Sequence, residues 1–306
     1  MAHKHHHIHA NSGDSKVAFA VALNLGLTIA QIIGGIVAGS LSLIADALHN
    51  LSDAIALIIA FAARKIARRP ADGRMTFGYD RIEAVAALIN YTTLIVVGFY
   101  LLYEAVLRFI TPSEVTGWII VFVAGIALAI DLATAALTYR LSKSSINIRA
   151  AFLHNLADAL GSVAVILAGT LVILFGWHWV DPLTTLLIAG YILWQSATEM
   201  PKVVRILMLG SPPHLDIQEV ITALEQTPGV ISVHHIHLWM MGEHDTALDA
   251  HIVHDAQADP GALRQTIKQQ LSAKFGVGHS TLELEKPQDC CPDTNQIGHR
   301  RHSEQQ

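Results

Sequence analysis

Six long apolar stretches, separated by short polar connections, fill about the first two thirds of the chain. A helix needs about 20 predominantly apolar residues to cross the hydrocarbon core of a membrane. The pattern therefore predicts six transmembrane helices, at residues 16–39, 41–66, 81–110, 116–141, 147–176 and 181–200. Little more than Gly39 and Ser40 separates the first two stretches, so we expect these two helices to form a tight hairpin.

Beyond about residue 208 the spacing of apolar residues changes to that of a small water-exposed domain. Helical spacing and strand-like alternation follow one another at 216–226 (helix), 230–240 and 246–254 (strands), 260–275 (helix) and 281–285 (strand). This α-β-β-α-β order indicates a small α+β domain. The predicted organisation is a His-rich disordered tail at 1–15, a six-helix transmembrane domain at 16–207, an α+β domain at 208–286 and a polar disordered tail at 287–306.

Composition supports a membrane protein and excludes some partners. Hydrophobic residues make up 52% of the chain and charged residues only 15%, with a mean hydropathy of +0.42. The formal net charge is -5, and no basic stripe interleaved with aromatic residues is present, so we expect no nucleic acid partner. The two cysteines, Cys290 and Cys291, are adjacent and cannot link distant segments, so we expect no disulfide framework.

Basic residues predict the orientation in the membrane, because short cytoplasmic loops collect Lys and Arg. They cluster after the second stretch (Arg64, Lys65, Arg68, Arg69, Arg74) and after the fourth (Arg140, Lys143, Arg149). Both termini are therefore predicted to lie in the cytoplasm, with the chain in the inner (cytoplasmic) membrane of the cell. On the opposite side Arg108 is nearly alone, and its position four residues after Glu104 predicts an ion pair between these two side chains.

A six-residue segment in the second apolar stretch recurs in the fifth with one change. His49-Asn50-Leu51-Ser52-Asp53-Ala54 corresponds to His154-Asn155-Leu156-Ala157-Asp158-Ala159. On a helix, residues four apart share one face, with Cβ atoms about 5 to 6 Å apart, so each copy presents an imidazole beside a carboxylate. A structural pairing within each copy is one interpretation. The duplication favours a shared site, in which His49, Asp53, His154 and Asp158 bind one tetrahedral divalent ion such as Zn²⁺.

Such ligands couple metal binding to protons. Zinc requires neutral imidazole and ionised carboxylate, so protons compete for the same atoms, and a site open alternately to the two sides can exchange metal for protons. Two further acids lie in these stretches. Asp46 is interpreted either as a fifth ligand or proton carrier, or as a residue that orients His49. Asp131 is interpreted as a helix-packing or water-pocket residue.

Several motifs resemble the cation diffusion facilitator family, in its bacterial zinc-exporter branch. They are the hairpin segment from Ser40 to Asp53, the segment Thr76-Phe77-Gly78-Tyr79-Asp80-Arg81-Ile82-Glu83, the copy at 154–158, and His234-His235-Ile236-His237-Leu238-Trp239. The similarity covers about 16–286. It implies a homodimeric, six-helix, proton-coupled exporter of divalent metal with a metallochaperone-like cytoplasmic domain. The family's transport ligands fall on His49, Asp53, His154 and Asp158, and a His at the first position is typical of zinc-preferring members.

The resemblance also implies a cytoplasmic metal site at His234, His251 and Glu283. With Leu282 and Leu284 in the core, strand alternation turns Glu283 and Glu285 outward. It partly disagrees with the implied site, however, because His234 shares a face with Ile236 and Leu238; either the strand is bulged, or His235 or His237 is the ligand. Ordinary surface histidines are the other interpretation. Cys290 and Cys291 are interpreted as thiolate donors or as tail thiols without this role. The connection after the second helix contains Asp72 and Asp80 but no His, so we expect no tight metal site there.

Other functions fit the sequence less well. An intramembrane zinc protease needs a nucleophilic water and a general base, typically in a His-Glu-x-x-His motif, and this motif is absent. A metal-sensing function would not explain why the chain has six membrane spans with paired metal ligands. Within the transporters, Cd²⁺, Co²⁺ or Ni²⁺ as the physiological ion is the alternative to Zn²⁺. The histidines at positions 3, 5, 6, 7 and 9 are interpreted as a loose metal-binding tail or an expression tag.

Overall fold

The structure is a computed structural model that describes residues 25–142, 146–243, 245–290 and 295–298. The expected His-rich tail at 1–15 and the beginning of the first predicted span lie outside the described residues. The chain divides into two compact units: Met1–Phe61 with Ile89–Glu199, and Ala62–Leu88 with Met200–Gln306.

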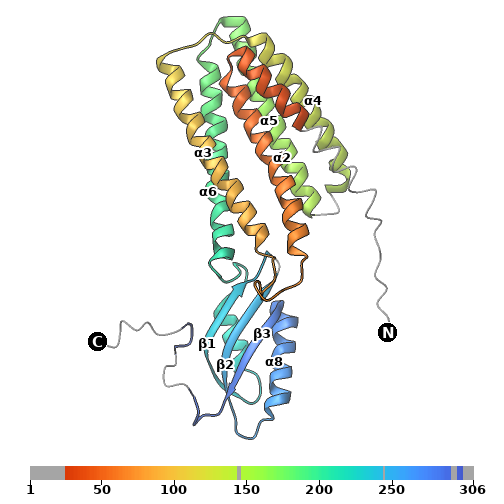
Figure 1. Cartoon of the computed structure of the whole chain (residues 1–306), viewed down its shortest axis with the longest axis vertical. Coiled ribbons are helices and arrows are strands. Elements are labelled where there is room, and N and C mark those ends of the chain that lie inside the picture. The colour runs from red at the N-terminus through yellow and green to blue at the C-terminus, as the bar shows by residue number, and fades with distance from the viewer. Residues whose placement is uncertain (1–24, 143–145, 244, 291–294, 299–306) are drawn as a thin grey trace, which may run out of the picture. The chain divides into compact units, whose positions relative to one another are not determined.

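A helix occupies the described part of each of the six predicted spans. The described helices of this part are Leu25–Ala38, α2 (Leu41–Ala67), α3 (Ile82–Ile110), α4 (Gly117–Ser142), α5 (Ile146–Phe175) and α6 (Val180–Leu207) (Figure 1). The largest difference is at α6, which continues through Pro201 to Leu207 instead of ending at residue 200. A proline removes one backbone hydrogen bond, which a helix of 28 residues tolerates near its end.

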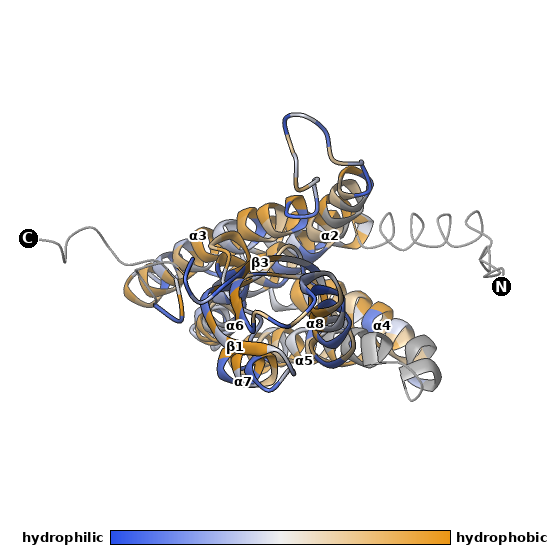
Figure 2. Cartoon of the chain, turned by 90° about the horizontal axis from the view of Figure 1, so that it is seen from below, coloured by the Kyte–Doolittle hydropathy of each residue, from blue (hydrophilic) through white to orange (hydrophobic). Residues whose placement is uncertain are grey.

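Among the described residues, three helical segments are long and apolar enough to cross a membrane: Ile82–Ile110, Gly117–Ala136 and Asn155–Phe175. The shorter helix Leu25–Ala38 is also apolar. Hydrophobic residues run along α2, α3 and α4 in Figure 2. The polar residues that α2 and α6 carry lower their hydropathy, and those of α2 include His49 and Asp53 of the predicted metal site.

The predicted hairpin between the first two helices is present. Gly39 has a φ of 68°, a left-handed conformation that favours glycine, and the Ser40 N–H donates to the Gly35 carbonyl at 2.9 Å. Buried side chains then join α2 to two groups of neighbours. One cluster contains Ala38, Leu43, Val115, Ile120, Ala124 and Val165, and the other contains Ala45, Leu101 and Ala189. Helix α2 therefore shares buried contacts with α4 and α5 in the first cluster and with α3 and α6 in the second.

Glycines allow α4 and α5 to approach closely. A Cβ added at Gly117 would lie 2.5 Å from the Gly169 carbonyl oxygen and 2.8 Å from the Ile173 Cγ1. We expect Gly117→Ala to destabilise the protein by about 1–3 kcal/mol, because the two helices must separate. Thermal unfolding in detergent measures this effect. The matched control is Gly125→Ala, also on α4, whose Cβ would meet nothing within 4 Å and which we expect to be neutral or slightly stabilising. Equal melting temperatures of the two variants would contradict this packing.

The first turn of α2 is capped by a carboxylate from α6. Asp181 is fully buried, and its two oxygens accept hydrogen bonds from the Leu41 N–H at 2.9 Å and the Ser42 N–H at 3.3 Å, and from the Ser40 and Ser42 hydroxyls at 2.5 and 2.6 Å. An acid at this position satisfies backbone donors that a helix start leaves unpaired.

Arg108 belongs to the same network. It lies 3.8 Å from the Asp181 carboxylate and donates to the Gly39 carbonyl. The sequence-based pairing of Arg108 with Glu104 is therefore wrong. A buried acid from a distant helix attracts the guanidinium more strongly than an acid on the same helix surface, where water screens the charge.

The C-terminal unit contains a three-stranded sheet with two helices on one face. Its elements are α7 (Ile217–Glu225), β1 (Val230–Met240), β2 (Thr246–His254), α8 (Pro260–Phe275) and β3 (Val277–Glu285) (Figure 1). The order of strands is β1-β2-β3, with β1 antiparallel and β3 parallel to β2. Apolar side chains of α7 and α8 pack on the sheet and form one core. The α-β-β-α-β order is as predicted, but β3 begins at Val277 rather than at residue 281.

The tail after β3 differs in part from the loose segment expected at 287–306. The His235 and Ile236 N–H groups of β1 donate to the Asn295 and Gln296 carbonyls at 3.0 and 3.1 Å, and Ile297 forms a parallel bridge with Ile236. In its described residues this tail therefore pairs with the free edge of β1. Sequence alone did not indicate this contact, because backbone hydrogen bonding requires no particular side chains.

Candidate metal sites

The duplicated motif brings donor atoms from α2 and α5 together. The His49 Nε2 lies 3.7 Å from the Asp53 Oδ2 on its own helix and 3.5 Å from the Asp158 Oδ1 on α5. One donor atom from each of these three residues lies within 4.8 Å of the other two. Two ligands of a tetrahedral zinc ion, each at about 2.0–2.2 Å, are roughly 3.4 Å apart. The three side chains therefore have the spacing of a zinc site before any rearrangement.

The cluster is largely protected from solvent. The side chain of His49 is 9% exposed, that of Asp158 12% and that of Asp53 26%. The fourth predicted ligand, His154, lies on α5 one turn before Asp158, but its side chain is outside the described residues. Its part in the site stays a prediction.

A buried hydrogen-bond network links two residues of α2, Asp46 and Asn50, to the first described helix. Its central residue, Gln31, was not predicted from the sequence. The Gln31 Nε2 donates to the Asp46 Oδ2 at 2.7 Å, and the Asn50 Nδ2 donates to the Gln31 Oε1 at 3.2 Å. Gln31 lies on the first described helix and is fully buried. A polar residue buried in an apolar stretch was the signal that could have identified it. The two interpretations of Asp46 both stay predictions, but its position is set by Gln31.

Tyr191 lies near the cluster, and Asp131 contacts a neighbouring helix. The ring of Tyr191 on α6 packs edge-on against His49, with centroids 6.2 Å apart. Sequence gave no signal for Tyr191, because its nearness depends on how α6 packs. On α4, the Asp131 Oδ2 accepts a hydrogen bond from the Ser162 hydroxyl of α5 at 3.2 Å, which agrees with a helix-packing role.

In the C-terminal unit, the three strands align the residues implied by the resemblance. His234 of β1 is paired with His251 of β2, and His251 with Glu283 of β3. The rings of His234 and His251 have centroids 5.2 Å apart, and the His251 Nε2 lies 3.3 Å from the Glu283 Oε2. One residue from each strand therefore forms a row across the sheet.

A β-bulge explains why the alternation of β1 disagreed with this row. The register shifts between His234 and His237, and His235 has a φ of 49°. The extra residue lets Val233 and Ile236 both enter the core while His234 lies on the opposite face. The first alternative, a bulged strand, is therefore correct. The ring of His235 also reaches His251, with centroids 4.9 Å apart, so His235 joins the cluster without replacing His234.

Glu285 is the residue of this cluster that sequence reasoning missed. Its Oε1 lies 2.6 Å from the His251 Nδ1 and its Oε2 lies 3.3 Å from the His234 Nε2. It is only 7% exposed, although alternation from Leu284 predicted a solvent-facing residue. His234 is 3% exposed, and burial lowers its pKa below the usual value for histidine. A lowered pKa keeps the imidazole neutral, which is the form that binds metal.

Two other regions have different roles. In the connection after α2, the Asp72 carboxylate accepts hydrogen bonds from the Tyr79 hydroxyl at 2.7 Å and from the Arg74 and Met75 N–H groups, and these bonds lower the pKa of Asp72. Asp72 therefore organises a turn.

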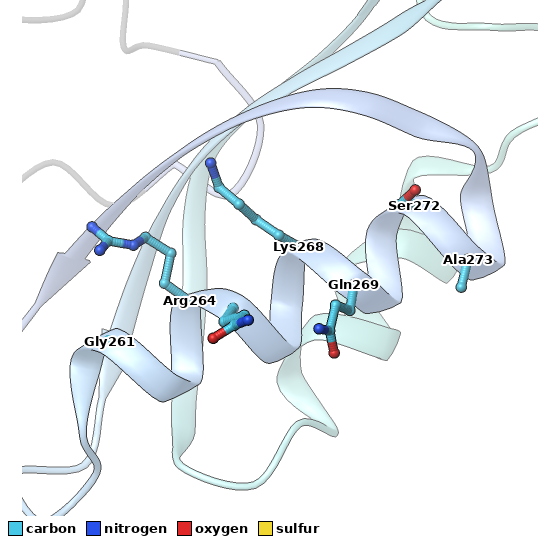
Figure 3. Close-up of a pocket in the computed structure, with 7 residues that line it drawn as sticks. Gly261, Arg264, Lys268, Gln269, Ser272 and Ala273 are labelled. Carbon is cyan, nitrogen blue, oxygen red and sulfur yellow. The ribbon is translucent and has the colours of Figure 1, made fainter. Parts of the chain in front are cut away.

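Figure 3 shows a hollow along α8; its lining residues are Gly261, Arg264, Gln265, Lys268, Gln269, Ser272 and Ala273. None of them is a usual metal ligand.

The fold defines an integral membrane protein with a cluster of His and Asp side chains among its long helices, and an α+β domain that carries a second cluster of His and Glu side chains. The family model of the cation efflux transmembrane domain matches residues 17–208, and that of the cation efflux protein cytoplasmic domain matches residues 212–287. The chain therefore belongs to the cation diffusion facilitator family of cation efflux proteins. It is a membrane-embedded metal cation efflux transporter with a cytoplasmic C-terminal domain, and not an enzyme.

Curated relatives cover nearly the whole chain. The cadmium, cobalt and zinc/H⁺-K⁺ antiporter of Bacillus velezensis is 36% identical over 92% of this chain and 91% of its own length. The metal cation efflux system protein CzcD of Cupriavidus metallidurans is 38% identical over 93% and 90%. The zinc transporter ZitB of Escherichia coli is 32% identical over 99% of both chains. Among solved structures, the metal-bound C-terminal domain of CzcD from Cupriavidus metallidurans is 33% identical, with a TM-score of 0.23, and covers 23% of this chain and 99% of that chain.

Proposed function

We propose that this transporter exports Zn²⁺ from the cytoplasm in exchange for protons, with the ion held by His49, Asp53, His154 and Asp158. The observation that carries the proposal is the contact of the His49 Nε2 with carboxylates of both α2 and α5. A set of two nitrogens and two oxygens suits zinc. The names of relatives that transport zinc also support this choice of ion.

Proton exchange follows from the same ligands. When zinc leaves on one side, the carboxylates in a low-dielectric site favour their protonated form, and a new dication favours the ionised form. Each transport cycle then moves protons opposite to the metal. The Bacillus velezensis relative is named for exchange with both protons and potassium, so potassium is the second candidate counter-ion.

We further propose a homodimer in the inner membrane of the cell, with both termini cytoplasmic. The family model matched by the C-terminal domain is named for dimerisation, and the basic residues after α2 agree with this orientation. We also propose that His234, His251 and Glu283, joined by Glu285, bind a further Zn²⁺ in the cytoplasmic domain.

Ion flux in proteoliposomes tests the transport proposal. Purified protein is reconstituted with a pH indicator inside the vesicles, and Zn²⁺ is added outside. We expect zinc uptake accompanied by a rise in internal pH, since protons leave as zinc enters. Imposed proton and potassium gradients, applied separately, identify the counter-ion, and Cd²⁺, Co²⁺ and Ni²⁺ in place of Zn²⁺ define selectivity. Zinc uptake that causes no pH change and ignores the proton gradient would contradict proton coupling.

A further inference from the structure

The residue that follows the turn after β3, Cys290, lies beside the cytoplasmic cluster. The chain turns directly after the strand, where the Asp289 N–H donates to the Lys286 carbonyl at 2.9 Å. A few residues later Asn295 accepts a hydrogen bond from the His235 N–H, at the bulge of β1. Cys290 is thus enclosed between two anchor points, the end of β3 and the edge of β1, and its side chain is partly buried.

Cys290 forms a second set of donor atoms with two residues of the cluster. One donor atom from each of His234, Glu285 and Cys290 lies within 4.8 Å of the other two. His234 is 3% and Glu285 7% exposed. The Glu285 carboxylate accepts a hydrogen bond from the thiol, so the sulfur and the carboxylate face each other.

The buried imidazole is directed into this set. Within the described residues the His234 Nε2 has no hydrogen bond, although it is buried and the Glu285 Oε2 lies 3.3 Å away. A buried polar atom without a hydrogen bond is costly unless a ligand satisfies it. The other oxygen of Glu285 contacts the His251 Nδ1 at 2.6 Å. Glu285 therefore links the row of His234, His251 and Glu283 to the thiol of Cys290.

We propose that Cys290 is a thiolate ligand of a second metal position in the cytoplasmic domain, which it shares with His234 and Glu285 and which takes a thiophilic divalent ion, Zn²⁺ or Cd²⁺. This inference rests on the proposal that the cytoplasmic cluster binds metal. A nitrogen, oxygen and sulfur set is a softer site than the two-His, two-Asp set in the membrane. Through Cys290, the C-terminal tail gives the domain a preference for softer metal ions than those the transport site prefers.

Cadmium titration of the full-length protein in detergent tests this position. A background variant, Asp53→Ala with Asp158→Ala, removes the transport site. Cadmium bound to thiolate gives an ultraviolet charge-transfer band, which carboxylate and imidazole ligands do not give. We expect the band to appear on titration, to be lost in Cys290→Ser, and to persist in the matched control Cys291→Ser. In His234→Ala we expect the cadmium concentration for half-saturation of the band to rise at least about 10-fold.

Bound cadmium is counted in parallel by elemental analysis, so that two failures are distinguishable. Cadmium that binds without the band, or a band that survives Cys290→Ser, overturns the role of Cys290 and leaves the cytoplasmic metal proposal standing. If the background variant binds no cadmium at all, the cytoplasmic metal proposal itself fails. Size-exclusion profiles of each serine variant show whether it is folded; serine differs from cysteine by a single atom, so the fold is expected to persist.

Discussion

We expect the replacement of Asp158 by Asn, or of Asp53 by Asn, to abolish zinc uptake in proteoliposomes at low zinc concentration. The amide keeps the size of the side chain but supplies no anionic oxygen, and the His49 Nε2 then faces a neutral group at a distance of 3.5 Å in the case of Asp158. Loss of a partner outside the ligand shell already lowers metal affinity about 10- to 100-fold in metalloproteins. Removal of a direct ligand is therefore expected to lower uptake by more than about 100-fold at low zinc concentration.

Asp131→Asn is the matched control for this experiment. Asp131 is also an acid on a membrane helix, but it accepts a hydrogen bond from Ser162 and contributes no donor atom to the cluster of His49, Asp53 and Asp158. We expect this variant to retain most of the wild-type uptake. If folded Asp158→Asn protein transported zinc as fast as the wild type, Asp158 would not be a ligand, and the proposed site would have to be abandoned.

The second large effect is on stability. We expect Asp181→Ala to lower the free energy of unfolding by about 3–5 kcal/mol, the usual cost of removing one partner of a buried ion pair. The carboxylate is completely buried, holds the N-terminus of α2 and faces Arg108. Its loss leaves several donors without an acceptor. The melting temperature of the purified protein in detergent, followed by size exclusion after heating, measures the effect.

Glu114→Gln, at an exposed acid just before α4, controls for the loss of one negative charge. Surface substitutions of this kind change stability by about 0.5 kcal/mol or less. Arg108→Ala, alone and combined with Asp181→Ala, completes a double-mutant cycle, and the combined loss should be smaller than the sum of the single losses. A strictly additive result would show that the guanidinium and the carboxylate act independently.

The periodicity of apolar residues was sufficient to predict the secondary structure. A helix lies in the described part of each of the six predicted spans, and all five elements of the C-terminal unit were predicted, because burial against lipid or a protein core imposes a local, repeated pattern on the sequence. The duplicated hexapeptide likewise identified His49, Asp53 and Asp158 as members of one cluster, since i,i+4 spacing places two side chains on one helix face regardless of the remaining fold.

The residues that were missed depend on segments far apart in the sequence. Gln31 contacts Asp46, and Tyr191 contacts His49, from other helices. Glu285 is buried although strand alternation turned it outward. Arg108 contacts Asp181 instead of Glu104 because a buried charge on a distant helix is the stronger partner. No local pattern encodes such contacts.

By itself, the sequence determined the order of the helices and strands, the duplicated His/Asp motif on two helices, and the family. Only the tertiary structure decided that the bulge at His235 turns His234 away from the core, and that the tail returns to β1 and leaves Cys290 beside Glu285. The physical reason is that periodic burial acts on neighbours in sequence, whereas a bulge and a returning tail are chosen by the competition of backbone hydrogen bonds and packing across the whole domain.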